Sequence, residues 1–308
     1  MPYKDTKITI IGIKRATPNV HKRFPPPYLR FMELKFNQWK NGSKRAPHKP
    51  LLFLLALGKW QQGQKQLTWK ETAPVLENLL EQYGPTTRKP TPENPWARLQ
   101  NDGFWELTPK PILHNGNYRA QDLLAQNSTG QLSPAVEAEL RSNPGALRLW
   151  VLDILEEQFA PSQHDAVLNA CGITLDAQTP SAKRKRDPNF AQAVLNNYQY
   201  QCGLCGFNLH LNKQPVGLEA AHIQWHAFEG PDHVRNGIAL CSLHHTLFDL
   251  GAFALSDDLT ILISSRIHGT SLEHLAQYHQ ANLLKKPLSF EEPGLEYVRW
   301  QREQVFKV

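Results

Sequence analysis

Three of the chain's four cysteines lie in two short motifs that have the spacing of metal ligands. Cys202 and Cys205 enclose two residues in CGLC, and Cys241 precedes His244 by three positions in CSLH. Three thiols and an imidazole form a tetrahedral ligand set that a structural zinc ion prefers. The pattern predicts one Zn2+ that joins two distant segments, so the C-terminal part of the chain must fold around it. We expect Cys171, which lies outside both motifs, to be dispensable.

A second histidine directly follows the predicted zinc ligand. His245 and Asp249 are four positions apart, so a helix would carry both on one face. An imidazole and a carboxylate one turn apart can hold a harder divalent ion and leave positions for water and a phosphate oxygen. Upstream, His222 lies in a run with the pattern of a strand, and Asn236 precedes the second cysteine motif. In chain order, His222, Asn236 and His245 spell H-N-H.

On these residues, positions 198–265 resemble an HNH endonuclease domain of the ββα-metal kind, in which two strands and a helix hold one divalent ion against the scissile phosphate. The resemblance implies that His222 is the general base, that Asn236 orients the loop or the base, and that His245 binds the ion. Mg2+, Mn2+, Co2+ and Ni2+ are the candidate ions. Histidine suits this chemistry because it can accept a proton near neutral pH.

The chain departs from the usual ββα-metal pattern at one position. Such domains usually carry an acidic residue or a histidine directly before the base, where this chain has Ala221. Asp249 is therefore the expected carboxylate ligand, and Glu219, two residues before Ala221, is a second candidate. No glycine-rich phosphate loop is apparent, so we expect hydrolysis without a nucleotide cofactor.

The charge distribution favours a polyanionic partner. The first 50 residues hold twelve Lys and Arg against Asp5 and Glu33, a balance of +10, which leaves 6 − 10 = −4 for the other residues. A basic segment of this kind is typical of nucleic-acid binding, although a solvated basic tail is the alternative. The sequence has neither an apolar run long enough to span a bilayer nor the pattern of a signal peptide. We therefore expect a cytoplasmic protein that does not bind membranes.

Apolar periodicity predicts a mainly helical N-terminal part. The expected helices are an amphipathic segment through Phe31, Met32, Phe36 and Trp39 that ends at Gly42, and the segments Pro50–Trp60, Thr72–Tyr83 and Leu147–Phe159. With 308 residues the chain is long enough for two domains. We expect an α+β protein with a basic extension (1–27), a helical DNA-binding domain (28–175), a linker (176–187) and a zinc-containing HNH nuclease domain (188–308).

Two segments of the helical domain, RAPHKPLLFLLALGKWQQG and NPWARLQNDGFWEL, resemble the sulfur-binding domains of type IV restriction endonucleases that cut phosphorothioated DNA. In that family a small apolar pocket recognises the sulfur that replaces a non-bridging phosphate oxygen. The resemblance implies that Arg45, His48, Pro50 and Arg98 contact DNA or sulfur. It also implies that the partner is double-stranded, phosphorothioated DNA, and the chain could act as a homodimer.

Two other functions fit the same motifs. A modified-cytosine-dependent or nonspecific HNH nuclease would share the catalytic half and could flip a base onto Trp96 or Trp105. A zinc protein that only binds DNA would keep the cysteine motifs and would not need the histidines. The presence of His222, Asn236 and His245 together argues against this last alternative.

Overall fold

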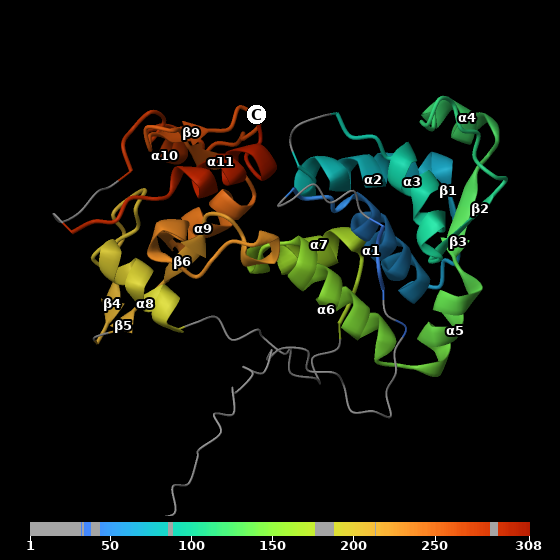
Figure 1. The fold of residues 1–308 in the computed structure, drawn as a ribbon, viewed down its shortest axis with the longest axis horizontal. Coiled ribbons are helices and arrows are strands. Elements are labelled where there is room, and N and C mark those ends of the chain that lie inside the picture. Colours follow the sequence, from blue (N-terminus) through green and yellow to red (C-terminus); the bar gives the residue numbers. More distant parts are fainter. Residues whose placement is uncertain are drawn as a thin grey trace, which may run out of the picture. The chain divides into compact units, whose positions relative to one another are not determined.

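The structure is a computed structural model that describes residues 32, 34–37, 44–85, 89–175, 188–212, 214–283 and 289–308. Residues 33–308 form one compact unit with both helices and strands (Figure 1). The predicted extension at 1–27 and the predicted linker at 176–187 lie outside the described residues. In the part of the chain that is described, no helix has the length and apolar character needed to cross a membrane.

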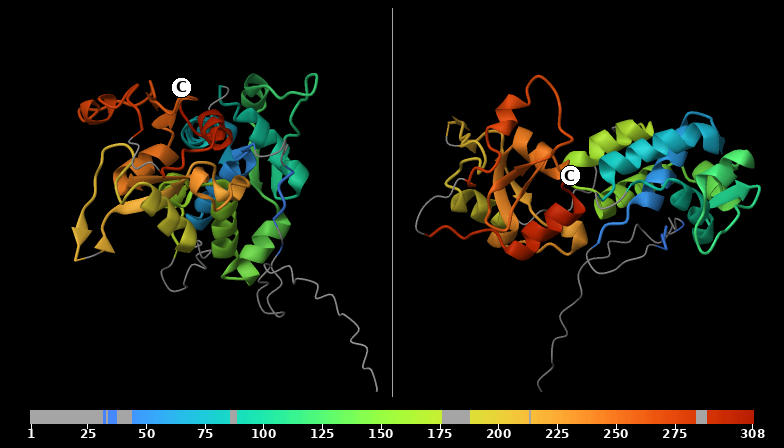
Figure 2. Two further views of the ribbon diagram at one scale, coloured as in Figure 1. Left: turned by 60° about the vertical axis from the view of Figure 1, so that its left-hand side comes forward. Right: turned by 90° about the horizontal axis from the view of Figure 1, so that it is seen from above.

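Helix α1 (His48–Gln61) is the central element of the N-terminal half. Its residues from Pro50 to Gly58 are all buried, because the run PLLFLLALG is apolar on every side of the helix. Four other helices pack against it (Figures 1 and 2): α2 (Trp69–Tyr83), α3 (Glu93–Arg98), α6 (Ala146–Gln158) and α7 (His164–Cys171). The helices predicted at Pro50–Trp60, Thr72–Tyr83 and Leu147–Phe159 are therefore confirmed.

A small antiparallel sheet, absent from the sequence-based expectation, accompanies these helices. Its strands are β1 (Gln66–Thr68), β2 (Trp105–Thr108) and β3 (Thr129–Leu132), in the order β1-β3-β2. A Cβ at Gly130 would lie 2.1 Å from the ring of Trp105, so only glycine lets this ring cross β3. Helices α4 (Ala120–Ala125) and α5 (Pro134–Ser142) flank β3 in the chain.

The helix predicted through Phe36 is wrong for the described residues, because 32 and 34–37 have no regular structure. The ring of Phe36 lies 5.7 Å from that of Phe53 in α1 and 5.5 Å from that of Phe104. Lys49 also donates from Nζ to the backbone oxygen of Asn37, at 2.9 Å. Packing on α1 therefore determines the conformation of this segment, and the three- and four-residue spacing of apolar side chains does not.

The C-terminal half is built around an antiparallel pair of strands and the helix that follows. Strand β6 (Leu218–His222) pairs with β7 (Gly237–Cys241), and α9 (Ser242–Asp249) begins directly after β7. Helix α8 (Pro188–Asn197) also packs on both strands. A Cβ at Gly237 would lie 2.2 Å from the side chain of Val194 in α8, so this approach requires glycine.

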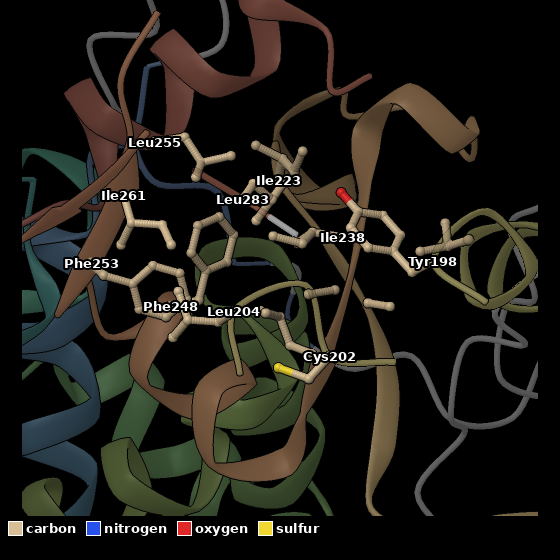
Figure 3. Packing of buried hydrophobic residues seen from close by; sticks show 14 of the residues in the cluster. Tyr198, Cys202, Leu204, Ile223, Ile238, Phe248, Phe253, Leu255, Ile261 and Leu283 are labelled. Carbon is tan, nitrogen blue, oxygen red and sulfur yellow. The ribbon is translucent and has the colours of Figure 1, made fainter. Parts of the chain in front are cut away.

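The remaining elements complete the C-terminal core. They are β4 (His210–Leu211) paired with β5 (Gln214–Pro215), β8 (Phe253–Leu255) paired with β9 (Ile261–Ile263), α10 (Glu273–Ala276) and α11 (Leu295–Gln304). Figure 3 shows Phe248 of α9 beside Phe253, with Ile238 of β7 and Tyr198 farther along the same cluster. The core therefore fixes the strand pair and α9 together.

Arg45, just before α1, connects the N-terminal and C-terminal halves. Its guanidinium donates to the backbone oxygens of Gln304 at 3.0 Å and Tyr83 at 2.8 Å. The same group lies 4.3 Å from the ring centroid of Trp225, in the segment after β6. Lys307 adds a second connection, because its Nζ donates to the backbone oxygen of Gly84 at 2.7 Å. In these contacts, polar groups are hydrogen-bonded inside the protein. The bonds hold the two halves together and also fix the geometry of the contact between them.

The close approach of α1 and α7 yields a stability prediction. A Cβ at Gly58 would lie 1.9 Å from the backbone oxygen of Cys171, so Gly58→Ala must push the two helices apart. We expect the free energy of unfolding to fall by about 1–3 kcal/mol in urea denaturation, the usual effect of overpacking. Gly145→Ala is the control, because a Cβ at Gly145 meets nothing within 4 Å. Equal losses for both variants would contradict this account of the α1–α7 contact.

Candidate functional site

The four predicted zinc ligands come together in the structure. The ligand atoms of Cys202, Cys205, Cys241 and His244 all lie within 4.8 Å of one another. Nδ1 of His244 is 3.3 Å from Sγ of Cys241 and 3.5 Å from Sγ of Cys202. A tetrahedral ion with three sulfur ligands and one nitrogen ligand requires separations of this size. The cluster could therefore hold a zinc ion.

The turn between the first two cysteines follows from local backbone geometry. Gly206 has φ of +74°, a left-handed conformation that glycine adopts without strain. Its amide donates to the backbone oxygen of Cys202 at 2.8 Å, while the amide of Cys202 donates to Phe207 at 2.9 Å. The amide of Gly203 donates to the backbone oxygen of Ala239 in β7, at 2.7 Å. These bonds hold the turn against the strand that ends at Cys241.

The thiols of the cluster differ in acidity. Burial opposes the charged form of Cys202, but hydrogen bonds from His244 and from nearby backbone amides outweigh it and lower the pKa to about 6. Burial, together with the charge of Cys202, raises the pKa of Cys205 to about 12 and also raises the pKa of Cys241. A bound cation would supply the positive charge that all three thiolates need. The donor set therefore fits a zinc ion chemically as well as geometrically.

His222 is the last residue of β6 and pairs in register with Gly237. Its ring stacks on Phe190 of α8, with centroids 4.0 Å apart and planes 14° from parallel. Its Nε2 is 2.7 Å from Oδ1 of Asp232. Sequence reasoning missed Asp232 because one acidic residue in a polar loop has no distinctive spacing. The carboxylate can fix the tautomer and the orientation of the His222 ring.

Asn236 is fully buried and closes the loop between β6 and β7. Its Oδ1 accepts from the amide of Gln224 at 2.8 Å, and its Nδ2 donates to the backbone oxygens of Gln224 and Pro231, both at 3.0 Å. One side chain thus binds both ends of the loop that carries Asp232. These hydrogen bonds hold the loop, and the role of Asn236 in orienting the loop or the base stays a prediction.

His245 lies between two carboxylates. Its Nδ1 is 2.6 Å from Oε2 of Glu219 on β6, and its Nε2 is 3.3 Å from Oδ2 of Asp249, one turn later on α9. Ser242 donates to Oε1 of Glu219 at 2.9 Å. Among the described residues, the cysteine–histidine cluster is the only group of three or more His, Cys, Asp or Glu whose ligand atoms all lie this close together. A second ion would therefore have His245 and one carboxylate as its principal protein ligands.

The helix α9 presents its two adjacent histidines to different partners. His244 faces the cysteines, whereas His245 faces Glu219. Glu219 and Ala221 are two positions apart on β6, so they share one face of the strand, and His222 belongs to the opposite face. Glu219 therefore lies on the strand face where an acidic residue at position 221 would lie. The alternation of side chains along β6 was readable from the sequence. It supports Glu219, the second of the two predicted carboxylate ligands.

The four predicted DNA- or sulfur-binding residues occupy different environments. Arg45 is buried; burial lowers its pKa to about 9, although the charge of Asp249 opposes the change. Its predicted contact with DNA stays a prediction, and its place between the two halves disfavours it. His48 begins α1, and burial, followed by the charge of Arg45, lowers its pKa. Pro50 is buried in α1.

Arg98 ends α3, the helix that packs on α1. Its Nη2 donates to the backbone oxygen of Gly116 at 2.7 Å, and its guanidinium lies 5.6 Å from the ring centroid of Tyr118. Next to His48, Lys49 lies 2.9 Å from the carboxylate of Asp102, which follows α3. The structure thus packs together the two helices that carry His48, Pro50 and Arg98.

Comparison with known families identifies both halves. The model described as "ScoMcrA-like, DNA sulfur-binding domain" matches residues 30–176, and the model described as "HNH endonuclease" matches residues 202–256. The chain joins a DNA sulfur-binding domain to an HNH endonuclease domain. The second match is to a family of endonucleases and covers part of the C-terminal half. No curated protein matches the sequence.

Solved structures of similar proteins carry related descriptions. The chain is similar to the "Modification dependent TagI restriction endonuclease", with 23% identity and a TM-score of 0.30 over 44% of this chain and 41% of that chain. It is also similar to the "Sulfur binding domain of SprMcrA complexed with phosphorothioated DNA", with 23% identity and a TM-score of 0.36 over 46% and 88% of the two chains. The chain thus spans less than half of the TagI structure. The family assignment rests on the two domain models.

The cysteine–histidine cluster gives a prediction on metal content. Protein purified without added zinc should contain about one equivalent, because structural zinc sites bind tightly. Cys202→Ala and His244→Ala should lose the zinc and lower the melting temperature, whereas His245→Ala should retain it. Elemental analysis and thermal unfolding would measure both effects.

Cys171→Ala is the control for this experiment. Cys171 is a buried thiol in α7, and burial raises its pKa to about 12, so it should remain an inert thiol. Zinc loss in His245→Ala with retention in His244→Ala would reverse the assignment of the two adjacent histidines.

Proposed function

We propose that this chain is a type IV restriction endonuclease that recognises phosphorothioated DNA and hydrolyses phosphodiester bonds near the mark. The observation that carries the proposal is the fusion, in one chain, of a DNA sulfur-binding domain with an HNH domain. We assign recognition to residues 28–175 and hydrolysis to residues 188–308. The basic N-terminal 50 residues add attraction for the DNA backbone.

Recognition is proposed to involve His48, Pro50 and Arg98. Sulfur is larger and more weakly hydrated than oxygen, so an apolar wall such as proline costs it less desolvation. Arg98 supplies a cation for the phosphorothioate anion. Burial lowers the pKa of His48 and so favours the neutral form of its ring. A neutral ring can contact sulfur and has no strong preference for an oxygen atom in its place. The packing of α1 on α3 supports a shared pocket.

Hydrolysis is proposed to use His222 as the general base. Asp232 accepts a hydrogen bond from Nε2 of His222, which assigns the proton-accepting role to Nδ1 and stabilises the imidazolium that forms. The stacking on Phe190 limits rotation of the ring. Asn236 holds the loop that presents Asp232. Each residue of this set therefore has a defined contact that supports its role.

The catalytic ion is proposed to bind at His245, with Glu219 and Asp249 as the neighbouring carboxylates. When bound there, Mg2+, Mn2+, Co2+ or Ni2+ would neutralise charge on the leaving oxygen and the phosphorus. The direct coordination of the ion by Asp249 stays a prediction. The separate cluster of three cysteines and His244 is proposed to hold a structural Zn2+ within a ββα-metal arrangement of β6, β7 and α9.

One observation weakens the modified-cytosine alternative in the form the sequence suggested. Trp96 is fully buried, and its indole nitrogen donates to Oγ of Ser128 at 3.1 Å. Trp105 is 2% exposed and packs against Gly130. Neither ring offers a face on which a flipped base could stack, so their expected role as stacking platforms is disfavoured.

The first functional prediction concerns binding. The full chain carrying His222→Ala should bind a phosphorothioated duplex more tightly than the same duplex unmodified or cytosine-methylated, in gel-shift assays. The affinity for all three should fall as salt rises, because phosphate contacts release counterions. Arg98→Ala should reduce the preference for sulfur. Equal binding to the plain and phosphorothioated duplexes would contradict the recognition of sulfur. A preference for the cytosine-methylated duplex would favour a modified-cytosine-dependent nuclease.

The second functional prediction concerns cleavage of phosphorothioated plasmid in the presence of each of the four candidate ions. His222→Ala should slow cleavage by about 10²–10⁴-fold, the usual contribution of a general base. His245→Ala should abolish cleavage. Both variants should keep their zinc and their affinity for modified DNA.

His226→Ala is the matched control for the base, because its exposed ring lies 6.3 Å from that of His222. It should cut at nearly the rate of the unsubstituted protein. Full cutting by His222→Ala together with loss of cutting in His226→Ala would move the base to His226.

A further inference from the structure

A short segment of the sulfur-binding domain contacts the nuclease helix α9. The segment is the single turn η2 (Pro161–Gln163) between α6 and α7. The hydroxyl of Ser162 donates to Oδ2 of Asp249, and Nε2 of Gln163 donates to the backbone oxygen of Asp249 at 2.6 Å. Ser162 lies inside the region matched by the sulfur-binding model, and Asp249 lies inside the region matched by the HNH model. The two domains thus meet at a residue one turn from His245.

Asp249 connects this contact to His245. The oxygen that accepts from Ser162, Oδ2, is also the one that lies 3.3 Å from Nε2 of His245. On the opposite edge of the imidazole, Nδ1 lies 2.6 Å from Glu219. The ring is therefore held between a carboxylate of its own helix and a carboxylate of β6, and movement of Asp249 would change the direction of both ring nitrogens.

Exposure distinguishes the two sides of the ring. The side chain of Asp249 is 3% exposed, whereas that of Glu219 is 45% exposed. A DNA phosphate and its water must reach the catalytic ion from solvent, so the accessible ligand position lies between Nδ1 of His245 and Glu219. The contact between Nε2 of His245 and Asp249 is buried, and Ser162 lies against it. We therefore interpret it as a contact that supports the ligand. Metal-binding histidines commonly have such a carboxylate on their second nitrogen.

We propose that Ser162 positions Asp249, and that Asp249 in turn positions His245 for the metal pair His245–Glu219. The sulfur-binding domain thereby supplies part of the support of the nuclease site. This inference rests on the proposed function, because it requires His245 to bind the catalytic ion. Ser162 and Asp249 then act through His245, so both are positioning residues, and Asp249 supports a ligand of the ion instead of coordinating the ion directly as the sequence predicted.

The physical basis is the cost of a buried carboxylate. Asp249 has lost its water, so its charge must be stabilised within the protein, by the nearby cation of Arg45 and by hydrogen bonds. The hydroxyl of Ser162 supplies one such bond directly to Oδ2. Without it, the carboxylate has one partner fewer and can turn away from Nε2 of His245. The His245 ring then samples more orientations, and each misaligned orientation weakens metal binding.

The test measures metal affinity instead of cleavage. The zinc-loaded full chain is titrated with Mn2+ in the absence of DNA, and the free ion is followed by electron paramagnetic resonance. Mn2+ suits this purpose because it prefers carboxylate and water oxygens over thiolates, so it leaves the cysteine cluster loaded with zinc. Zinc content, thermal midpoint and affinity for a phosphorothioated duplex are measured for every variant.

We expect Asp249→Asn to weaken Mn2+ binding by about 10–100-fold, the range for supporting residues around metal ligands. Ser162→Ala should weaken it in the same direction, with unchanged zinc content and unchanged affinity for phosphorothioated DNA. Ser142→Ala is the matched control, because Ser142 is an exposed serine whose hydroxyl donates to the backbone oxygen of Ala138 within α5. It should bind Mn2+ like the unsubstituted protein.

Each outcome bears on a separate claim. Unchanged Mn2+ affinity in Ser162→Ala would overturn the inference, whatever the result for Asp249→Asn. If Asp249→Asn does not fold, the milder Ser162→Ala decides alone. Unchanged Mn2+ affinity in His245→Ala would instead count against the proposed catalytic site, so failure of the inference and failure of the proposed function remain distinguishable.

Discussion

The convergence of three thiols and one imidazole governs the geometry of the C-terminal half. Cys202 and Cys205 belong to a turn, whereas Cys241 ends β7 and His244 lies in the first turn of α9, so their meeting fixes the helix against the strand pair. Adjacent residues on a helix are rotated by about 100°. Once His244 faces the sulfurs, the rotation of α9 is set, and His245 must face β6. The position of the candidate catalytic ligand thus follows from the position of the structural cluster.

The features that the sequence predicted are those that depend on short-range spacing. Paired cysteines identified the metal cluster, a four-residue spacing placed His245 and Asp249 on one helix, and an uninterrupted apolar run identified α1 as a core helix. The resemblance to sulfur-binding and HNH domains was also readable, because its motifs are contiguous segments. In each case the physical cause lies within a few residues of the signal.

Features that depend on tertiary packing were missed or misassigned. The strands of the N-terminal sheet have three or four residues each, too few to show a period of two. The segment around Phe36 has helical spacing, yet contacts with Phe53 and Phe104 set its conformation. The burial of Arg45 between the two halves was also not readable from the sequence, and its contact with DNA, implied by the family resemblance, stays a prediction. Asp232 and Ser162 have partners that no local pattern indicates.

The bridge formed by Arg45 limits how freely the two domains could be exchanged between proteins. Its guanidinium donates to the backbone oxygens of Tyr83 in the N-terminal half and Gln304 in the C-terminal half, and it lies over the ring of Trp225 in the segment after β6. A chimera cut at residues 176–187 would separate a buried cation from its acceptors, which is costly. A nuclease module grafted onto a different DNA reader would have to bring matching acceptors with it. Among recombinants of such proteins, we therefore expect only those to persist in which the buried cation and its acceptors in both halves come from the same parent protein.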